Sequence, residues 1–296
     1  MNTQNNHNKG FLLGFIAVTA FALTLPATRF LTPYFDPVFI GLGRACIAAV
    51  VAALILFTTR SPKPSNAQLR QLALVALGVV IGFPLFTAVG MQTVAASHGG
   101  VVLGVLPLAT VLASRLVSDE RPSTAFYCMS VIGMGIVVCF SLLSSSDGIG
   151  LGTGDIALFL AVICAGFGYA LGAHLSKSMG GWQVICWALV IAFPLVIVPT
   201  ILSAPSNLTA LPTSAWLAFL YLSLVSQLFG FFIWYHALAI GGIARVSQTQ
   251  LLQPFITLCA AALLLGESLD TQVLLFAFAV LLCVGFGKRM PIHQSS

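Results

Sequence analysis

Two stretches of the sequence decide the fold: PLATVLASRLVSDERPST at residues 107–124 and PFITLCAAALLLGESLDT at residues 254–271. At an offset of 147 residues they align without a gap, and identical residues coincide at Pro107/Pro254, Thr110/Thr257, Ala113/Ala260, Glu120/Glu267 and Thr124/Thr271. The alternative is a chance resemblance between two apolar segments. Because the apolar segments on either side also superpose at this offset, we interpret the match as an internal repeat of residues 1–147 and 148–296.

The composition around these stretches is that of a membrane protein. Of the 296 residues, 59% are hydrophobic and 6% are charged, and the mean hydropathy is +1.05. An average soluble domain carries about 25% charged residues. So few charges cannot cover a water-exposed surface, which excludes a soluble enzyme and a nucleic-acid-binding protein. The lipid bilayer is therefore the expected surrounding.

A helix needs about 20 apolar residues to cross the hydrocarbon core of a bilayer. Ten stretches meet this requirement, and their connections are too short to form a soluble domain. The sequence predicts an all-α integral membrane protein with ten transmembrane helices, at residues 11–31, 38–58, 72–91, 97–118, 125–143, 155–175, 183–202, 214–239, 244–265 and 273–288.

The repeat and the basic residues together predict the topology. Each half has five spans, and an odd number forces the halves to cross the membrane in opposite directions, as in the inverted repeats of secondary transporters. Cytoplasmic loops carry an excess of Lys and Arg. With both termini in the cytoplasm, ten basic residues fall on that side: Lys9, Arg60, Lys63, Arg70, Arg115, Arg121, Lys177, Arg245, Lys288 and Arg289. Arg29 alone lies near an outer end, which favours a multi-pass protein of the plasma or inner membrane.

One local pattern resembles a known family. The segment Trp234-Tyr235-His236-Ala237-Leu238, the stretch 244–254 and the triplet Leu265-Gly266-Glu267 are similar to the second repeat of the EamA family of drug/metabolite transporters. The first half carries a weaker copy with Pro107 and Asp119-Glu120, and the first span lacks the usual Trp. The resemblance implies ten helices around a central cavity, alternating access, and frequently export of amino acids or other small metabolites.

The two repeat-related prolines and nearby amides are the first candidates for a substrate site. A proline removes one backbone hydrogen bond and frees a carbonyl one turn earlier, which is tolerated inside a membrane when it faces protein or water. Amide side chains at membrane depth also need a partner or water. Small and polar residues form one helical face on each of the spans 97–118 and 244–265. These two faces, together with the amide of Gln227 in the span 214–239, predict a substrate site. Its residues are Leu103, Pro107, Gln227, Gln250, Gln253 and Pro254. Packing kinks and interhelical hydrogen bonds are the alternatives.

Aromatic residues and one buried arginine complete the predicted site. Phe83, Tyr169 and Trp234 can wall a cavity for an amphipathic or cationic ligand, although most membrane aromatics serve packing. Arg44 is the only basic residue well inside a span, where an unpaired charge is costly. Three alternatives stay open for Arg44: binding a substrate carboxylate, pairing with Asp36 or backbone carbonyls, or reaching the outer surface.

Other chemistry has little support in the sequence. The seven cysteines form no CxxC pair and are read as free thiols, and we expect no cofactor and no metal. Glu120 and Glu267 are expected to cap or orient the tight turns that follow them, and His98, His174 and His236 to be packed or solvated. No acidic residue is placed in the middle of a span, so an intramembrane enzyme is a rival without a visible active site, and a receptor or scaffold is another.

The charge count narrows the solute. A single Arg is too little to neutralise a dianionic sugar phosphate at low dielectric, and the first span lacks the Glu expected of a small multidrug carrier. The sequence therefore predicts a secondary transporter for a small neutral, zwitterionic or amphipathic solute such as an amino acid, and the family resemblance implies that it is an exporter. The sequence alone leaves the direction of transport and the oligomeric state open.

Overall fold

The computed structural model describes residues 3–117, 120–143, 152–207, 211–288 and 292–294. Its elements are almost all helices, and the described strands are the short antiparallel pair β1 and β2. The first half contains α1 (Thr3–Ala22), α2 (Thr24–Leu31), the π-helix η1 (Phe39–Gly43), α3 (Arg44–Thr58), α4 (Asn66–Val75), the π-helix η2 (Ala76–Gly82), α5 (Phe83–Gly90), α6 (Ala96–Leu103), α7 (Leu106–Val117), β1 (Glu120–Pro122) and α8 (Thr124–Leu143).

The second half is also built of helices. It contains α9 (Thr153–Met179), α10 (Gly181–Leu202), α11 (Thr213–Leu220), the π-helix η4 (Tyr221–Phe229), α12 (Gly230–Gly241), α13 (Ile243–Val246), the 3-10 helix η5 (Ser247–Leu252), α14 (Gln253–Leu265), α15 (Thr271–Lys288) and β2 (Ile292–Gln294).

Seven continuous helical stretches in the described residues are long and apolar enough to cross a membrane. They coincide with seven of the ten expected spans, including the stretch from α4 to α5 and that from α11 to α12. Three shorter apolar helices, Val131–Phe140, Thr249–Leu265 and Thr271–Cys283, fall in the remaining expected spans. The chain is therefore a multi-span membrane protein, as its composition predicts.

Helix breaks recur at the offset of the sequence repeat. Four pairs of helices, α4 and α11, α6 and α13, α7 and α14, and α8 and α15, begin 147 residues apart. The π-helical segments η2 and η4 also overlap at this offset. The two halves therefore share these helix starts and a π-helical segment, while the first two spans of the first half are broken where α9 and α10 are continuous.

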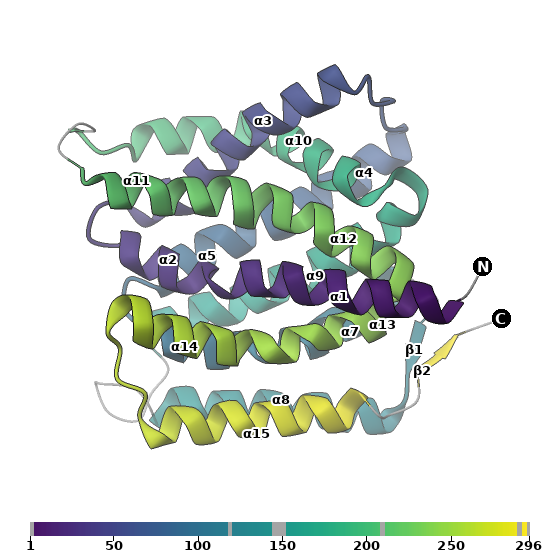
Figure 1. The fold of residues 1–296 in the computed structure, drawn as a ribbon, viewed down its shortest axis with the longest axis vertical. Coiled ribbons are helices and arrows are strands. Elements are labelled where there is room, and N and C mark those ends of the chain that lie inside the picture. The colour runs from purple at the N-terminus through teal and green to yellow at the C-terminus, as the bar shows by residue number, and fades with distance from the viewer. Residues whose placement is uncertain (1–2, 118–119, 144–151, 208–210, 289–291, 295–296) are drawn as a thin grey trace.

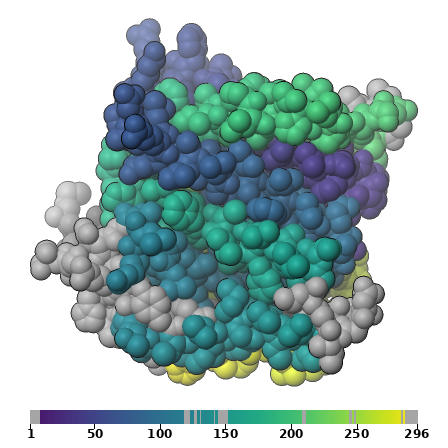
Figure 2. Space-filling model, turned by 180° about the vertical axis from the view of Figure 1, so that it is seen from behind, coloured from purple at the N-terminus to yellow at the C-terminus, as the bar shows by residue number. Residues whose placement is uncertain are grey.

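The halves interleave in space. Helix α1 packs against α12, α3 against α10, and α7 against α9. In Figure 1 both chain ends lie at the same end of the bundle. Seen from the opposite side in Figure 2, surfaces of the first half (purple and blue) adjoin surfaces of the second half (green) without separate lobes.

Pro107 and Pro254 lie where their helices are irregular, as expected. Helix α6 ends at Leu103 and α7 resumes at Leu106, while η5 tightens to a 3-10 helix directly before α14. One part of the expectation is wrong. The carbonyl of Gln250, which Pro254 deprives of its usual donor, accepts the N–H of Gln253 instead. The tighter 3-10 turn supplies this replacement, so the carbonyl is not free.

Glycines let the two irregular helices approach closely. A Cβ added at Gly100 would lie 3.1 Å from Thr257 Cγ2, and one added at Gly104 would lie 3.3 Å from Pro254 Cγ. Small residues allow such close approach between membrane helices. Helix α6 and Gly104 directly after it therefore pack closely against the start of α14 at Pro254 and Thr257.

The first span is also broken, between α1 and α2. Pro26 cannot donate to the carbonyl of Ala22, and the hydroxyl of Thr257 donates to that carbonyl over 2.8 Å. The hydroxyl of Tyr221 donates to the neighbouring carbonyl of Ala20 over 2.5 Å. Side chains of α14 and η4 therefore hold the backbone of the first span at its break.

Candidate functional site

Arg44 is buried at the start of α3 and is the centre of the candidate site. Its side chain is 1% exposed, and Nη2 donates to Ser226 Oγ over 3.1 Å. Ser226 Oγ also lies 2.8 Å from Thr24 Oγ1. The hydrogen-bonded group thus joins α3, η4 and α2, and it contains one charge and two neutral hydroxyls.

The structure excludes two of the arrangements considered for Arg44, the pair with Asp36 and exposure at the outer surface. No ion pair joins Asp36 to Arg44 among the described residues, and Asp36 Oδ1 accepts the N–H of Val38 over 2.8 Å at its own helix start. Burial rules out that the guanidinium reaches the outer surface. Within the described part of the chain, Arg44 has no carboxylate partner and its Nε has no hydrogen-bond partner.

An aromatic cluster from α1, α9 and α12 lies beside Arg44. The Tyr169 ring is 5.7 Å from that of Trp234 and 5.8 Å from that of Phe231, centre to centre, and Phe21 contacts all three. Phe21 lies one helical turn before Thr24, whose hydroxyl contacts Ser226, the hydrogen-bond partner of Arg44. The charge and the aromatic rings therefore belong to one region of the interior.

Several other polar groups in the interior have no partner among the described residues. They are Gln227 Oε1, Trp234 Nε1, and both amide atoms of Gln250. Gln227 Nε2 donates to the carbonyl of Val79 over 3.0 Å, which fixes its side chain between η4 and η2. An unpaired buried polar atom costs about 1–3 kcal/mol. Groups left in this state are candidates to bind a polar ligand.

The remaining predicted site residues are buried in two other places. Phe83 begins α5 directly after η2. Leu103, Pro107, Gln253 and Pro254 lie at the irregular segments of α6–α7 and η5–α14. Their contribution to a substrate site stays a prediction.

Phe21, Thr24 and Ser226 were not anticipated from the sequence. Thr24 and Ser226 are separated by 202 residues, and their contact depends on how α2 packs against η4. One signal was present: Ser226 directly precedes Gln227 within an otherwise apolar span.

Charged side chains converge on the connection between α5 and α6. Arg29 Nη1 donates to the carbonyls of Met91 and Gln92, over 2.5 and 3.1 Å. The carboxylate of Glu267 accepts the N–H groups of Ala96 and Ser97, over 2.8 and 2.9 Å. The expectation that Glu267 orients its own following turn is therefore wrong, because it caps a helix of the other half, where the helix dipole favours an anion.

Asp155 contacts the same region. Its Oδ1 lies 2.7 Å from His98 Nε2, and both side chains are buried. His98 is packed, as expected, and its ring centre lies 4.6 Å from that of Phe140. The side chain of Glu120 lies outside the described residues. The connection from Met91 to His98 is thus held by α2, α9 and the residues that follow α14.

These features define a class: a polytopic membrane protein with a buried cationic and aromatic site among helices of both halves, as small-solute carriers have. The EamA-like transporter family matches residues 8–142 and again residues 152–286, and the chain belongs to this family.

Two relatives are similar to the chain over most of its length, and one solved structure shares its fold. The chain is 41% identical to the Bacillus subtilis (strain 168) uncharacterized transporter YdeK, over 97% of this chain and 99% of that protein. It is 23% identical to the uncharacterized transporter YyaM of the same strain, over 83% of this chain and 82% of that one. One crystal structure shares the fold, with a TM-score of 0.67 and 18% identity, over 94% of this chain and 96% of the other.

Proposed function

We propose that this protein is a secondary transporter, and an exporter in particular, that moves a small zwitterionic or amphipathic organic solute by alternating access. Ten spans form two inverted five-helix repeats, residues 1–147 and 148–296, and both termini face the cytoplasm. Membership of a transporter family favours this function over an intramembrane enzyme, a receptor or a scaffold.

The observation that carries the proposal is the buried guanidinium of Arg44. A charge inside the bilayer costs several kcal/mol unless it is paired or hydrated, and among the described residues the guanidinium of Arg44 has the hydroxyl of Ser226 as its hydrogen-bond partner. A single carboxylate of a solute would supply the missing negative charge. Arg binds a carboxylate through two parallel hydrogen bonds, and its unpaired Nε–H is available for one of them.

The aromatic cluster favours a solute with an apolar part. Phe21, Tyr169 and Trp234 are almost fully buried and together offer flat apolar surface beside the guanidinium. A ligand group stacked on these rings gains from area burial. Gln227 Oε1, one residue from Ser226, is an acceptor for a donor such as an ammonium group. One carboxylate, one donor and an apolar part describe an amino-acid-like solute.

Repetition of the helix breaks supports alternating access. Inverted repeats place the solute site between the halves, and each half can adopt the conformation of the other. Here the π-helical segments η2 and η4 touch through Gln227 and Val79, and the broken spans α6–α7 and η5–α14 cross near Pro254. Both contacts join equivalent elements, where such an exchange would occur.

A ligand screen followed by reconstitution tests the proposal. Purified protein is screened by thermal shift against a metabolite library, since a ligand stabilises by RT ln(1 + [L]/Kd). Solutes that raise Tm are then tested for counterflow in proteoliposomes, with the Arg44→Gln variant as the comparison. Counterflow that requires Arg44 supports the proposal. Counterflow restricted to solutes without a carboxylate, or unaffected by Arg44→Gln, contradicts it.

A further inference from the structure

Two pockets on the outside of the bundle share an edge. The first has a volume of about 330 Å³ and lies between α2, the α11–η4 junction and the end of α14. The second, of about 430 Å³, lies beside it where the helices end, and its lining includes Arg29 and Glu267. Phe30 and Leu265 line both pockets. One elongated groove therefore has an apolar part and a charged part.

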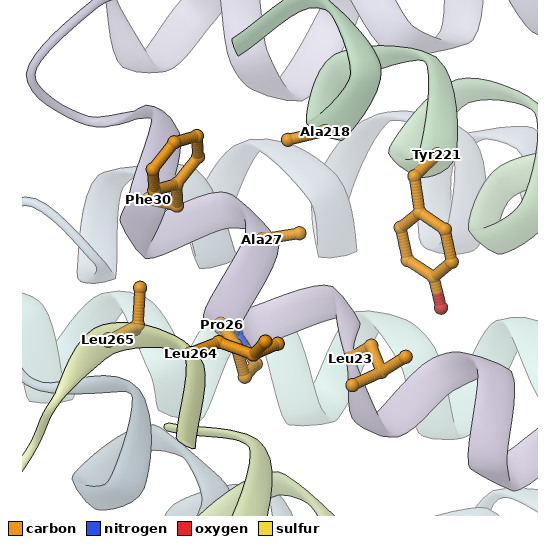
Figure 3. Close-up of a pocket in the computed structure, with 8 residues that line it drawn as sticks. All are labelled: Leu23, Pro26, Ala27, Phe30, Ala218, Tyr221, Leu264 and Leu265. Carbon is orange, nitrogen blue, oxygen red and sulfur yellow. The ribbon is translucent and has the colours of Figure 1, made fainter. Parts of the chain in front are cut away.

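The apolar part runs along α2 toward the middle of the first span. Figure 3 shows Phe30 and Leu265 at one end of it and Leu23 and Tyr221 at the other. The seven steps along the helix from Leu23 to Phe30 correspond to about 10 Å. The hydroxyl of Tyr221 is its principal polar group, and that hydroxyl already donates to Ala20. This length and polarity fit part of an acyl chain.

The groove opens toward lipid. Leu264, at its rim, is 67% exposed, and the adjacent Leu263 is 84% exposed. Leu217 on α11, at the other side, is 62% exposed. Large apolar side chains exposed on a membrane-spanning helix face hydrocarbon, so a molecule can enter this groove from the bilayer.

The charged part offers opposite charges at the membrane surface. Both N–H groups of Arg29 Nη1 are used by the carbonyls of Met91 and Gln92. Its Nε and Nη2 groups have no partner within the described ranges, so three of its five N–H donors are free. Glu267 uses both oxygens on the start of α6 but remains an anion in the pocket wall. The wall is thus complementary to a phosphate and an ammonium side by side.

We propose that this groove binds a phospholipid with a zwitterionic ethanolamine headgroup from the leaflet on the Arg29 side. The phosphate lies on the free N–H groups of Arg29, and the ammonium group lies near Glu267. One acyl chain fills the pocket between α2 and α11. The groove has the same orientation as a lipid in the bilayer, because its charged part lies at the helix ends and its apolar part lies toward the midplane. The bound lipid would fill the space beside Tyr221 and stabilise the break between α1 and α2.

The test uses delipidated full-length protein in detergent, with thermal shift and native mass spectrometry as readouts. Three probes are compared: phosphatidylethanolamine, phosphatidylglycerol and glycerophosphoethanolamine, which lacks acyl chains. Ala218→Trp fills the apolar pocket, and Val198→Trp adds the same ring at an exposed position on α10 as a matched control. Arg29→Gln removes the charge.

We expect phosphatidylethanolamine to raise Tm and to remain bound to the wild type and to Val198→Trp. Ala218→Trp should lose both effects, and Arg29→Gln should bind about tenfold more weakly, as for loss of one charge-assisted contact. Equal retention by Ala218→Trp and the wild type overturns the proposal. So does equal stabilisation by phosphatidylglycerol, or by the headgroup without chains. None of these results depends on which solute is transported.

Discussion

Arg44 Nη2 donates to Ser226 Oγ over 3.1 Å, between residues that lie 182 positions apart in the sequence. A hydroxyl is a weak partner for a full charge inside a membrane, so this arrangement lowers the stability of the fold. An arginine kept only for packing would be expected to have a carboxylate or several carbonyls around it. Ligand binding is a reason for the protein to keep the charge unpaired.

Replacing Arg44 by Met should therefore separate stability from function. The apolar side chain removes a buried, poorly compensated charge. We therefore expect the free energy of unfolding to stay the same or to rise by up to about 1–3 kcal/mol, with Tm unchanged or higher. Transport of the solute identified in the screen should be lost. Arg44→Lys keeps a charge without the planar fork and should transport poorly. A destabilised Arg44→Met variant that still transports would show that Arg44 has a structural role.

Trp234 and Gln250 should contribute to solute binding through atoms that have no hydrogen-bond partner among the described residues. Trp234→Phe removes the unpaired indole N–H, and Gln250→Met removes the unpaired amide at similar length. Both variants should fold normally and lower the transport efficiency by about tenfold, the effect of one hydrogen bond of about 1.4 kcal/mol. Trp187→Phe is the matched control, because Trp187 Nε1 is also unpaired among the described residues, but Trp187 lines a separate pocket with Leu56 and Phe57 of α3. Unchanged kinetics in both variants would remove these residues from the site.

Glu267→Gln should weaken the start of α6. The amide keeps one acceptor oxygen but loses the charge that the helix N-terminus favours, so we expect a loss of about 1 kcal/mol in stability, measured by thermal unfolding. Asp36→Asn is the control, because Asp36 caps its own helix start and holds no second segment. Only Glu267→Gln should increase the reactivity of a cysteine introduced at Gln92 with an impermeant thiol reagent. Equal reactivity in both variants would contradict this role.

Labelling from one side of the membrane tests the inverted repeat. Single cysteines at Ser123 and Asp270, in a background without the seven native cysteines, follow equivalent helices of the two halves. Because five spans lie between them, we expect Ser123 to react from the cytoplasmic side and Asp270 from the outer side. Reaction of both positions from the same side would exclude the topology.

Transport should not require a proton gradient. The described acidic side chains lie in connections or near helix ends, and the buried Asp155 is the third residue of α9 and is engaged by His98. In proteoliposomes, a pH gradient without a solute gradient should produce no accumulation. Uphill accumulation that an uncoupler abolishes would refute this, and its loss in Asp155→Asn would identify the responsible carboxylate.

The sequence predicted the fold better than it predicted the contacts. Span positions follow from hydropathy and the helix breaks from Pro107 and Pro254, since both are properties of local sequence. Arg44 and Trp234 could be chosen because a charge or an indole inside an apolar run is unusual. Their neighbours could not be predicted, because helical periodicity gives the face on which Thr24 lies but not the helix that packs against it.

The partner of Glu267 likewise could not be predicted from the local sequence. Its position after a helix C-terminus is unfavourable for an anion, which signals a partner elsewhere. The partner is the start of α6, 171 residues earlier in the chain. Local reasoning could identify the anomaly but assigned it to the adjacent turn, because nothing near Glu267 in the sequence points to Ala96.

The separation of 171 positions between Ala96 and Glu267 also determines the order in which parts of the fold can form during synthesis. During synthesis, α6 leaves the ribosome and enters the membrane long before Glu267 is translated, so the N–H groups of Ala96 and Ser97 must first bond to water. Their final acceptor arrives only when the ninth apolar segment has been inserted. The amino-terminal half alone therefore lacks the acceptor that caps its fourth helix. We expect this half to gain stability when the carboxy-terminal half is supplied, even as a separate polypeptide.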